Sequence, residues 1–132
     1  MQNPTTLILK DSVEHKPPFF LASDGVTPAT TMAAAMQTQR IYTGRESCSV
    51  LLAWTGTGSG TISIYETDDP ADSTGFAIPA ANLPALAAAQ PAGTAGRIWI
   101  PNIASQALYR WFGYAPSGGG SDGALTVTIG AL

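Results

Sequence analysis

One stretch, residues 47–67, constrains the fold of this chain more than any other. Its sequence is SCSVLLAWTGTGSGTISIYET, in which two extended runs, 50–54 and 61–65, flank a linker rich in Gly, Ser and Thr. Both runs are rich in β-branched, aromatic or aliphatic residues and contain no proline, which is typical of strands. We therefore expect residues 47–67 to form a two-stranded antiparallel hairpin with its turn at 56–60.

Short apolar runs separated by Gly- and Pro-rich turns continue along the rest of the chain. Further strands are expected at 5–13, 39–43, 76–78, 97–101, 107–115 and 124–129. A short helix is expected at 82–90, capped by Asn82 and stopped by Pro91. Residues 30–36 suit either two helical turns or, being small and Met-rich, a docking surface. The pattern predicts an all-β fold: an antiparallel β-sandwich or jelly roll with an irregular N-terminal arm and one short helix.

Alternation within three of these runs predicts which side chains share a face of the strand. In 97–101 the face with Ile98 and Ile100 opposes the face with Arg97 and Trp99. In 124–129 the inward residues are Leu125, Val127 and Ile129. In 107–115 the face carrying Leu108, Arg110, Phe112 and Tyr114 opposes the face carrying Ala107, Tyr109, Trp111 and Gly113.

A length of 132 residues suits one domain that can bury a core without a metal or disulfide staple. We divide it into an N-terminal strand and irregular arm, 1–39, and a β-sandwich body, 40–132. The single cysteine, Cys48, excludes an internal disulfide and lies in a strand run, which predicts a buried thiol. Neither a secretory signal nor a membrane helix is expected, because no apolar run approaches the roughly 20 residues that a span needs.

Charged residues are scarce. Only 11% of the chain is charged, where about 25% is usual for soluble domains. The net charge is -3 and no basic patch is visible, so nucleic acid is not an expected partner. A free monomer normally carries more interspersed charge than this. The composition therefore predicts that a partner, or copies of the same chain, cover much of the surface.

Three motifs resemble catalytic or binding sites but lack the parts that those sites need. The run 119–123 matches the G-x-S-x-G pattern of serine hydrolases, yet a strand follows it and the only histidine, His15, comes far earlier. The glycines at 56–60 precede a strand, whereas a nucleotide-binding fingerprint needs a helix there. The acidic run 68–72 has carboxylates suited to calcium but no EF-hand spacing, which favours a solvated turn. We expect no catalytic residues, no cofactor, no metal and no enzymatic activity.

Four aromatic residues are candidates for a platform on which a sugar stacks: Trp54, Trp99, Tyr109 and Trp111. Large aromatic side chains in a β-domain are more often part of the core or of an interface. Both interpretations stay open at this point.

The C-terminal two thirds of the chain resembles a known group of proteins in the order of its segments. These segments are GTGSGTISIYE at 56–66, YRWF at 109–112 and SDGALTVTI at 121–129. They resemble small β-sandwich virion proteins of tailed bacteriophages, including capsid decoration (cement) proteins and some tail components. The resemblance implies a non-enzymatic structural protein that stabilises a phage head, with the major capsid protein as a partner. It implies location in the virion, after assembly in the host cytoplasm. A phage tail or baseplate component and a carbohydrate-binding β-domain are the alternatives.

The apolar residues of the N-terminal third do not recur at a spacing that would place them on the buried face of a strand or helix. They are therefore expected to contact other molecules, namely Phe19, Phe20, Leu21, Met32 and Met36. The resemblance favours self-association as a trimer, since decoration proteins often occupy threefold positions. Deletion of residues 1–39 is expected to leave a folded β-domain that no longer assembles. A flat apolar face with the arm outside the sandwich would favour assembly, whereas exposed aromatic residues in a groove beside the acidic loop would favour sugar binding.

Overall fold

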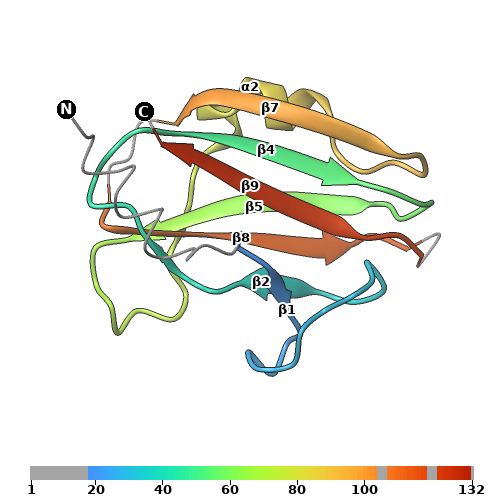
Figure 1. Cartoon of the computed structure of the whole chain (residues 1–132), viewed down its shortest axis with the longest axis horizontal. Coiled ribbons are helices and arrows are strands. Elements are labelled where there is room, and N and C mark those ends of the chain that lie inside the picture. Colours follow the sequence, from blue (N-terminus) through green and yellow to red (C-terminus); the bar gives the residue numbers. More distant parts are fainter. Residues whose placement is uncertain (1–17, 104–106, 119–121, 132) are drawn as a thin grey trace.

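Two antiparallel sheets pack face to face and confirm the predicted all-β sandwich (Figure 1). The computed structural model describes residues 18–103, 107–118 and 122–131. The strand expected at 5–13, His15 and Ser121 lie outside these residues.

The larger sheet has the strand order β1-β2-β8-β5-β6, and β3 also pairs with β8. Its strands are β1 (Phe20–Leu21), β2 (Met36–Thr38), β3 (Ile41–Tyr42), β5 (Gly60–Thr67), β6 (Phe76–Ala77) and β8 (Tyr109–Pro116). The longest pairing joins β5 and β8, from Gly60 opposite Pro116 to Thr67 opposite Tyr109. The strands predicted near 39–43, 76–78 and 107–115 are thus confirmed.

The smaller sheet has the order β7-β4-β9. Its strands are β4 (Cys48–Trp54), β7 (Gly96–Ile103) and β9 (Leu125–Ala131). A 3₁₀ turn, η1 (Ala80–Asn82), and one short helix, α2 (Pro84–Ala88), connect β6 to β7. The helix was predicted, but its capping residue was wrong: the N-cap is Leu83, and no side chain caps it. No helix in the described part of the chain is long and apolar enough to cross a membrane.

The predicted hairpin at 47–67 is wrong, although both of its strands exist. β4 pairs with β7 and β9, and β5 pairs with β6 and β8, so the two strands belong to different sheets. Residues 55–59 cross from one sheet to the other. Five residues can span about 16 Å, which exceeds the roughly 10 Å between packed sheets. The linker is therefore long enough for either connection, and the apolar faces of the two strands decide the outcome by facing each other across the core.

Alternate residues of the strands build that core, as the periodicity predicted. Side chains buried from the smaller sheet include Val50, Leu52, Ile100 and Val127, and those from the larger sheet include Ile62, Ile64, Phe112 and Tyr114. The crossing loop is fixed at one end of the core, where Gly56 and Gly123 allow two backbone segments to touch. A side chain at either glycine would collide with the backbone of the other segment.

Residues 20–38, which we assigned to the irregular arm, are part of the sandwich. β1 and β2 extend the larger sheet beyond β8, at the margin of the molecule opposite α2 and β7 (Figure 1). Residues 30–35 form turns and no helix, and Met36 begins β2. Deletion of residues 1–39 would therefore remove two strands of the sheet, together with side chains of the core.

Candidate ligand-binding groove

A groove of about 640 Å³ lies on the outer face of the larger sheet, across β1, β2, β8 and β5. Its position follows from the registers of these strands. Leu21 lies opposite Gln37, Gln37 opposite Gly113, and Gly113 opposite Ser63. Since residues in register share one face of a sheet, these four residues form a row across the groove.

The floor of the groove is formed by small residues of β8. Along the outer face of this strand, Trp111 is followed by Gly113 and then by Ala115. Gly113 lacks a side chain between Gln37 and Ser63, and the ring of Tyr65 leans over it. A Cβ atom at Gly113 would lie 2.8 Å from Cε2 of Tyr65. The ring of Tyr65 therefore occupies the space that any other residue at position 113 would require.

One end of the groove is closed by a stack of three side chains. The Tyr65 and Trp111 rings are stacked with centroids 5.7 Å apart and planes 17° from parallel. The Arg40 guanidinium carbon lies 4.6 Å from the Trp111 ring centroid. Tyr65 comes from β5 and Arg40 precedes β3, and these strands flank β8, so Trp111 is held from both sides. Only 2% of Trp111 is exposed, which leaves Tyr65 as the aromatic ring that borders the groove.

The acidic loop 68–75 lies directly behind this stack. Arg40 Nη1 donates a hydrogen bond to the Pro70 carbonyl oxygen at 3.1 Å, and Gly75 packs against the edge of Trp111. Hydrogen bonds from the Gly75 and Thr74 backbone N–H groups hold the pKa of Asp72 below its usual range. The carboxylates of this loop thus brace its own backbone, and the loop supports the wall of the groove.

The other carboxylates of the acidic run have similar roles. Asp69 accepts from the Ala71 N–H at 2.9 Å, and Asp68 accepts from the Leu108 N–H at 3.0 Å. Within the described residues, no three His, Cys, Asp or Glu side chains gather in a way that could hold a metal ion. The carboxylates of this run thus accept hydrogen bonds from nearby backbone N–H groups.

The groove exposes more apolar than polar surface and is almost free of charge. Its hydrogen-bonding side chains include Gln37, Gln39, Thr61 and Ser63, and no Asp or Glu is among the described residues that line it. One hydrogen-bonding atom of Gln39 is already used within the chain, because its Oε1 accepts from the Phe19 N–H at 3.3 Å. Amide and hydroxyl groups beside an aromatic ring can bind a ligand that has many hydroxyl groups and apolar C–H faces.

The four aromatic residues proposed as a sugar platform do not come together. Trp54 is buried in the core, where its Nε1 donates to the Thr94 carbonyl oxygen at 3.1 Å. Trp99 is 62% exposed, but it lies on the smaller sheet. Tyr109 packs edge-to-face against Tyr42, with ring centroids 5.6 Å apart. That platform was therefore wrong, and Trp111 alone lies at the groove, as a covered support for Tyr65.

The five residues expected at an intermolecular interface divide into two groups. Phe20, Met32 and Met36 are buried in the core of the chain itself, so the reasoning that left them without a place in the sandwich was wrong. Phe19 is 47% exposed, and the half-buried Leu21 borders the groove. An interface role remains a prediction for these two residues.

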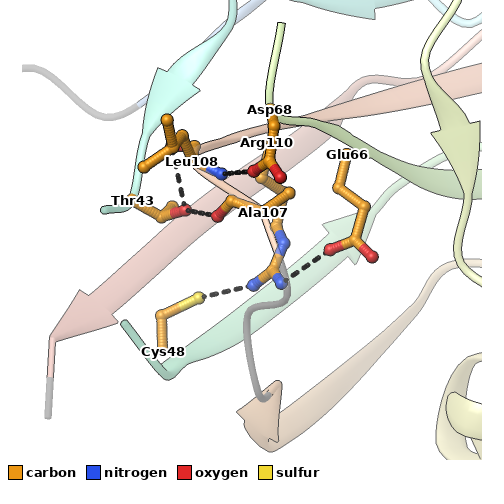
Figure 2. A network of polar contacts seen from close by, with 7 residues as sticks. All are labelled: Thr43, Cys48, Glu66, Asp68, Ala107, Leu108 and Arg110. Carbon is orange, nitrogen blue, oxygen red and sulfur yellow. Dashed lines mark hydrogen bonds and ion pairs between the residues drawn. The ribbon is translucent and has the colours of Figure 1, made fainter. Parts of the chain in front are cut away.

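A second polar cluster lies inside the sandwich, at the end of β8 away from the groove floor (Figure 2). The guanidinium of Arg110, whose side chain is fully buried, points between Cys48 and Glu66. Nη1 donates to Cys48 Sγ at 3.2 Å, and Nη2 lies 3.5 Å from Glu66 Oε2. Nε has no hydrogen-bond partner among the described residues. Arg110 therefore lies on the core face of β8 together with Phe112 and Tyr114, the two residues that the alternation placed on its side of the strand.

The surroundings of Arg110 indicate a structural role for this cluster. Thr43 donates from its hydroxyl to the carbonyl oxygens of Ala107 and Leu108, at 3.3 Å each (Figure 2). Cys48 is buried, as predicted, and burial raises the pKa of its thiol despite the neighbouring Arg110. A protonated, inaccessible thiol is a poor nucleophile. The cluster links the segment after β3 with β4, β5 and β8, and none of its residues is among those that line the groove.

Comparison with known proteins assigns no family to the chain. No model of a protein family matches the sequence, and no curated protein matches it either. One similar solved structure is TmCBM61 in complex with beta-1,4-galactotriose, with a TM-score of 0.46 and 10% identity over 100% of both chains. Another is the enzymatically active domain of tailspike protein 4 of bacteriophage CBA120, with a TM-score of 0.46 and 17% identity. That match covers 85% of this chain but only 17% of the tailspike chain. Similarity at this level assigns no function.

Proposed function

We propose that this protein is a non-catalytic carbohydrate-binding β-sandwich that holds an oligosaccharide in the groove above Gly113. The observation that carries this proposal is the groove itself, a glycine floor between Gln37 and Ser63 with the Tyr65 ring at its end. Its volume of about 640 Å³ lies within the range of small-molecule sites in proteins.

The side chains of the groove suit a sugar better than they suit an apolar ligand. A sugar ring has an apolar face of C–H groups, which packs on an aromatic ring, and a rim of hydroxyl groups. Gln37 offers both a donor and an acceptor to such hydroxyls, and Thr61 and Ser63 add hydroxyl groups of their own. Tyr65 is already fixed by its stack on Trp111, so little side-chain entropy is lost when a ligand binds.

The surroundings of the groove support the same choice between the alternatives. The Tyr65 ring borders the groove, and the acidic loop lies beside this end of it. The link is Arg40, which contacts both Trp111, on which Tyr65 stacks, and Pro70 of the loop. The segment 20–38 belongs to the sheet and does not lie outside the sandwich. The expectation for sugar binding was exposed aromatic residues, whereas the ring that borders the groove, that of Tyr65, is half-buried, so only the place of the groove matches that expectation.

Binding without hydrolysis is part of the proposal. Most glycoside hydrolases use a pair of carboxylic acids on either side of the bond that they cleave. No Asp or Glu is among the described residues that line this groove. Turnover assays on any oligosaccharide that binds are expected to give no product.

A glycan array followed by calorimetry tests the proposal. The native chain should bind at least one oligosaccharide, and Tyr65→Ala should weaken that binding by about tenfold or more, because the ring that contacts the sugar is removed. The matched control is Trp99→Ala, which removes an exposed aromatic side chain from the other sheet. Equal effects of the two substitutions, or a lack of binding to every glycan, would contradict the proposal.

A virion structural role is a second candidate, favoured by the scarcity of charge and by exposed apolar side chains. Phe76 is 72% exposed and Trp99 62% exposed, and they lie on different sheets. Aromatic residues are enriched at interfaces between protein molecules. In this candidate the chain is a decoration protein or tail component whose copies, as a trimer, cover these side chains.

Sedimentation and binding to phage particles test this second candidate. Double substitution of Phe76 and Trp99 by serine should leave a folded chain that no longer associates. Deletion of residues 1–17 is a better probe of the N-terminal segment than deletion of 1–39, because it leaves β1 and β2 intact. A native chain that sediments as a monomer and binds no particle would remove this candidate.

A further inference from the structure

We infer that Arg40 makes the groove selective for glycans that carry a carboxylate, such as uronic or sialic acids; this inference rests on the proposed function. Arg40 is the single charged side chain among the described residues that line the groove. The positive charge of Arg40 is opposite in sign to the net charge of the whole chain, which is -3. A cation at the end of a groove without acidic side chains attracts an anionic group to that end.

The Arg40 guanidinium is held in place before any ligand arrives. Its plane packs on the Trp111 ring, with 4.6 Å between the guanidinium carbon and the ring centroid. Its Nη1 donates to the Pro70 carbonyl oxygen at 3.1 Å, which ties it to the acidic loop. Because arginine normally loses much rotamer freedom on binding, a guanidinium fixed from two sides binds its ligand at lower entropic cost.

The remaining donors of Arg40 match a carboxylate. A guanidinium has five N–H donors, and the bond to Pro70 uses one of them. Nε and Nη2 form a planar fork that fits the two oxygens of a carboxylate in a bidentate arrangement. Among the described residues no ion pair joins Asp72 to this fork, and the Asp72 oxygens accept from Thr67, Thr74 and Gly75. The pKa of Asp72 is lowered chiefly by the Gly75 and Thr74 N–H groups and least by the charge of Arg40, which acts on it at longer range.

The position of Arg40 also sets the orientation of the ligand. Arg40 and Tyr65 both line the groove and flank Trp111 on opposite sides of β8. The sugar that packs on Tyr65 and the acidic sugar at Arg40 are therefore different residues of one oligosaccharide, with the acidic sugar at the end. Its neutral neighbours would then extend over Gly113 towards Thr61. The acidic sugar is thus placed at the Arg40 end of the groove, and the rest of the oligosaccharide lies over Gly113.

Paired neutral and acidic glycans test this inference. We would titrate the native chain with trigalacturonate and its methyl ester, and with 3′-sialyllactose and lactose. The acidic member of a pair should bind about ten- to a hundredfold more tightly, as expected for charge-assisted hydrogen bonds. Arg40→Gln should remove this preference, and Arg40→Lys should keep only part of it, because lysine has the charge but not the fork. The preference should weaken as salt is added.

The matched control is Arg97→Gln, which removes the same charge from an exposed position on β7 of the other sheet. It should leave the preference intact, and thermal unfolding of each variant shows whether it still folds. Equal binding of acidic and neutral glycans, or a preference that survives in a folded Arg40→Gln variant, overturns the inference while the proposed function stands. Absence of binding to every glycan, on an array that includes neutral ones, overturns the proposed function itself.

Discussion

Replacing Gly113 with alanine should abolish glycan binding while leaving the fold largely intact. The new Cβ would lie 2.8 Å from Tyr65 Cε2 and 3.6 Å from Gln37 Cγ. The Tyr65 ring must therefore move by about 0.6 Å or more to reach an ordinary contact distance. This movement disturbs the stack of the ring on Trp111, and the added methyl group lies on the floor of the groove.

Two opposing effects set the change in stability. Overpacking at a well-packed position costs about 1–3 kcal/mol. Alanine in a strand is favoured over glycine by about 0.5–1 kcal/mol, since glycine loses more backbone entropy on folding. Gly113 is not among the glycines with positive φ, so alanine adopts its conformation without strain. The net loss should be about 1–2 kcal/mol, which lowers the Tm by about 3–8 °C for a domain of this size.

Calorimetric titration with the best glycan from the array, beside thermal unfolding, measures both effects. We expect binding to fall by at least about tenfold in Gly113→Ala. The control is Gly130→Ala in β9, where a Cβ would crowd the Ser49 side chain at 2.6 Å on the other sheet. Native affinity in Gly113→Ala would show that the ligand does not lie over this residue. Failure of the variant to fold would refute the estimate of the stability change.

Three further predictions concern the scaffold. Gly123→Ala should cost more than about 2 kcal/mol in urea unfolding, because Gly123 has a φ of 101° and a Cβ there would collide with the Thr55 carbonyl oxygen; an unchanged midpoint would refute this. Hydrogen bonds from the Thr57 hydroxyl and N–H lower the pKa of Asp122 below its unfolded value of 3.8, so its contribution to stability is present above pH 3.8 and is lost as the pH falls through the folded pKa. Asp122→Ala should therefore flatten acid unfolding followed by circular dichroism, and an unchanged acid slope would contradict the role of this contact. Cys48 should react with a thiol reagent only at the rate of unfolding, since it is buried and its pKa is raised; rapid labelling of the native chain would show that the site is open.

The faces of individual strands could be predicted because they follow from a local period of two residues. The alternation in 124–129 placed Val127 in the core, where the structure has it. In 97–101 and 107–115 the alternation separated the two faces of each strand but did not say which face is buried; the structure buries the faces of Ile100 and Arg110. The pairing partner of a strand is not local, which is why β4 and β5 were assigned to one hairpin.

The N-terminal third shows a second limit of sequence patterns. Met32 is fully buried, although it lies in a turn and follows no period. Its place is fixed by contacts far along the chain, including the bond from its N–H to the Gly123 carbonyl oxygen at 3.0 Å. Irregular segments of this kind provide no local signal that distinguishes core residues from interface residues.

The groove had a partial signal in the sequence. On one face of 107–115 the residues change from Tyr109 and Trp111 to Gly113, which indicates where a sheet surface becomes hollow. Using that signal requires knowledge that β2 and β5 flank β8. The role of Tyr65 was missed, because it was assigned to a hairpin partner of β4. Selection of aromatic residues by type alone favoured Trp99, which lies on the other sheet.

The most direct test of the central claim is a ¹H–¹⁵N NMR titration of the native chain with an oligosaccharide that it binds. The largest shifts should come from amides of the groove floor and wall, in particular Gln37, Ser63, Tyr65 and Gly113. The amides around Trp99 should change little. Shifts centred on the smaller sheet, or spread without a centre, would contradict the assignment of the groove as the binding site.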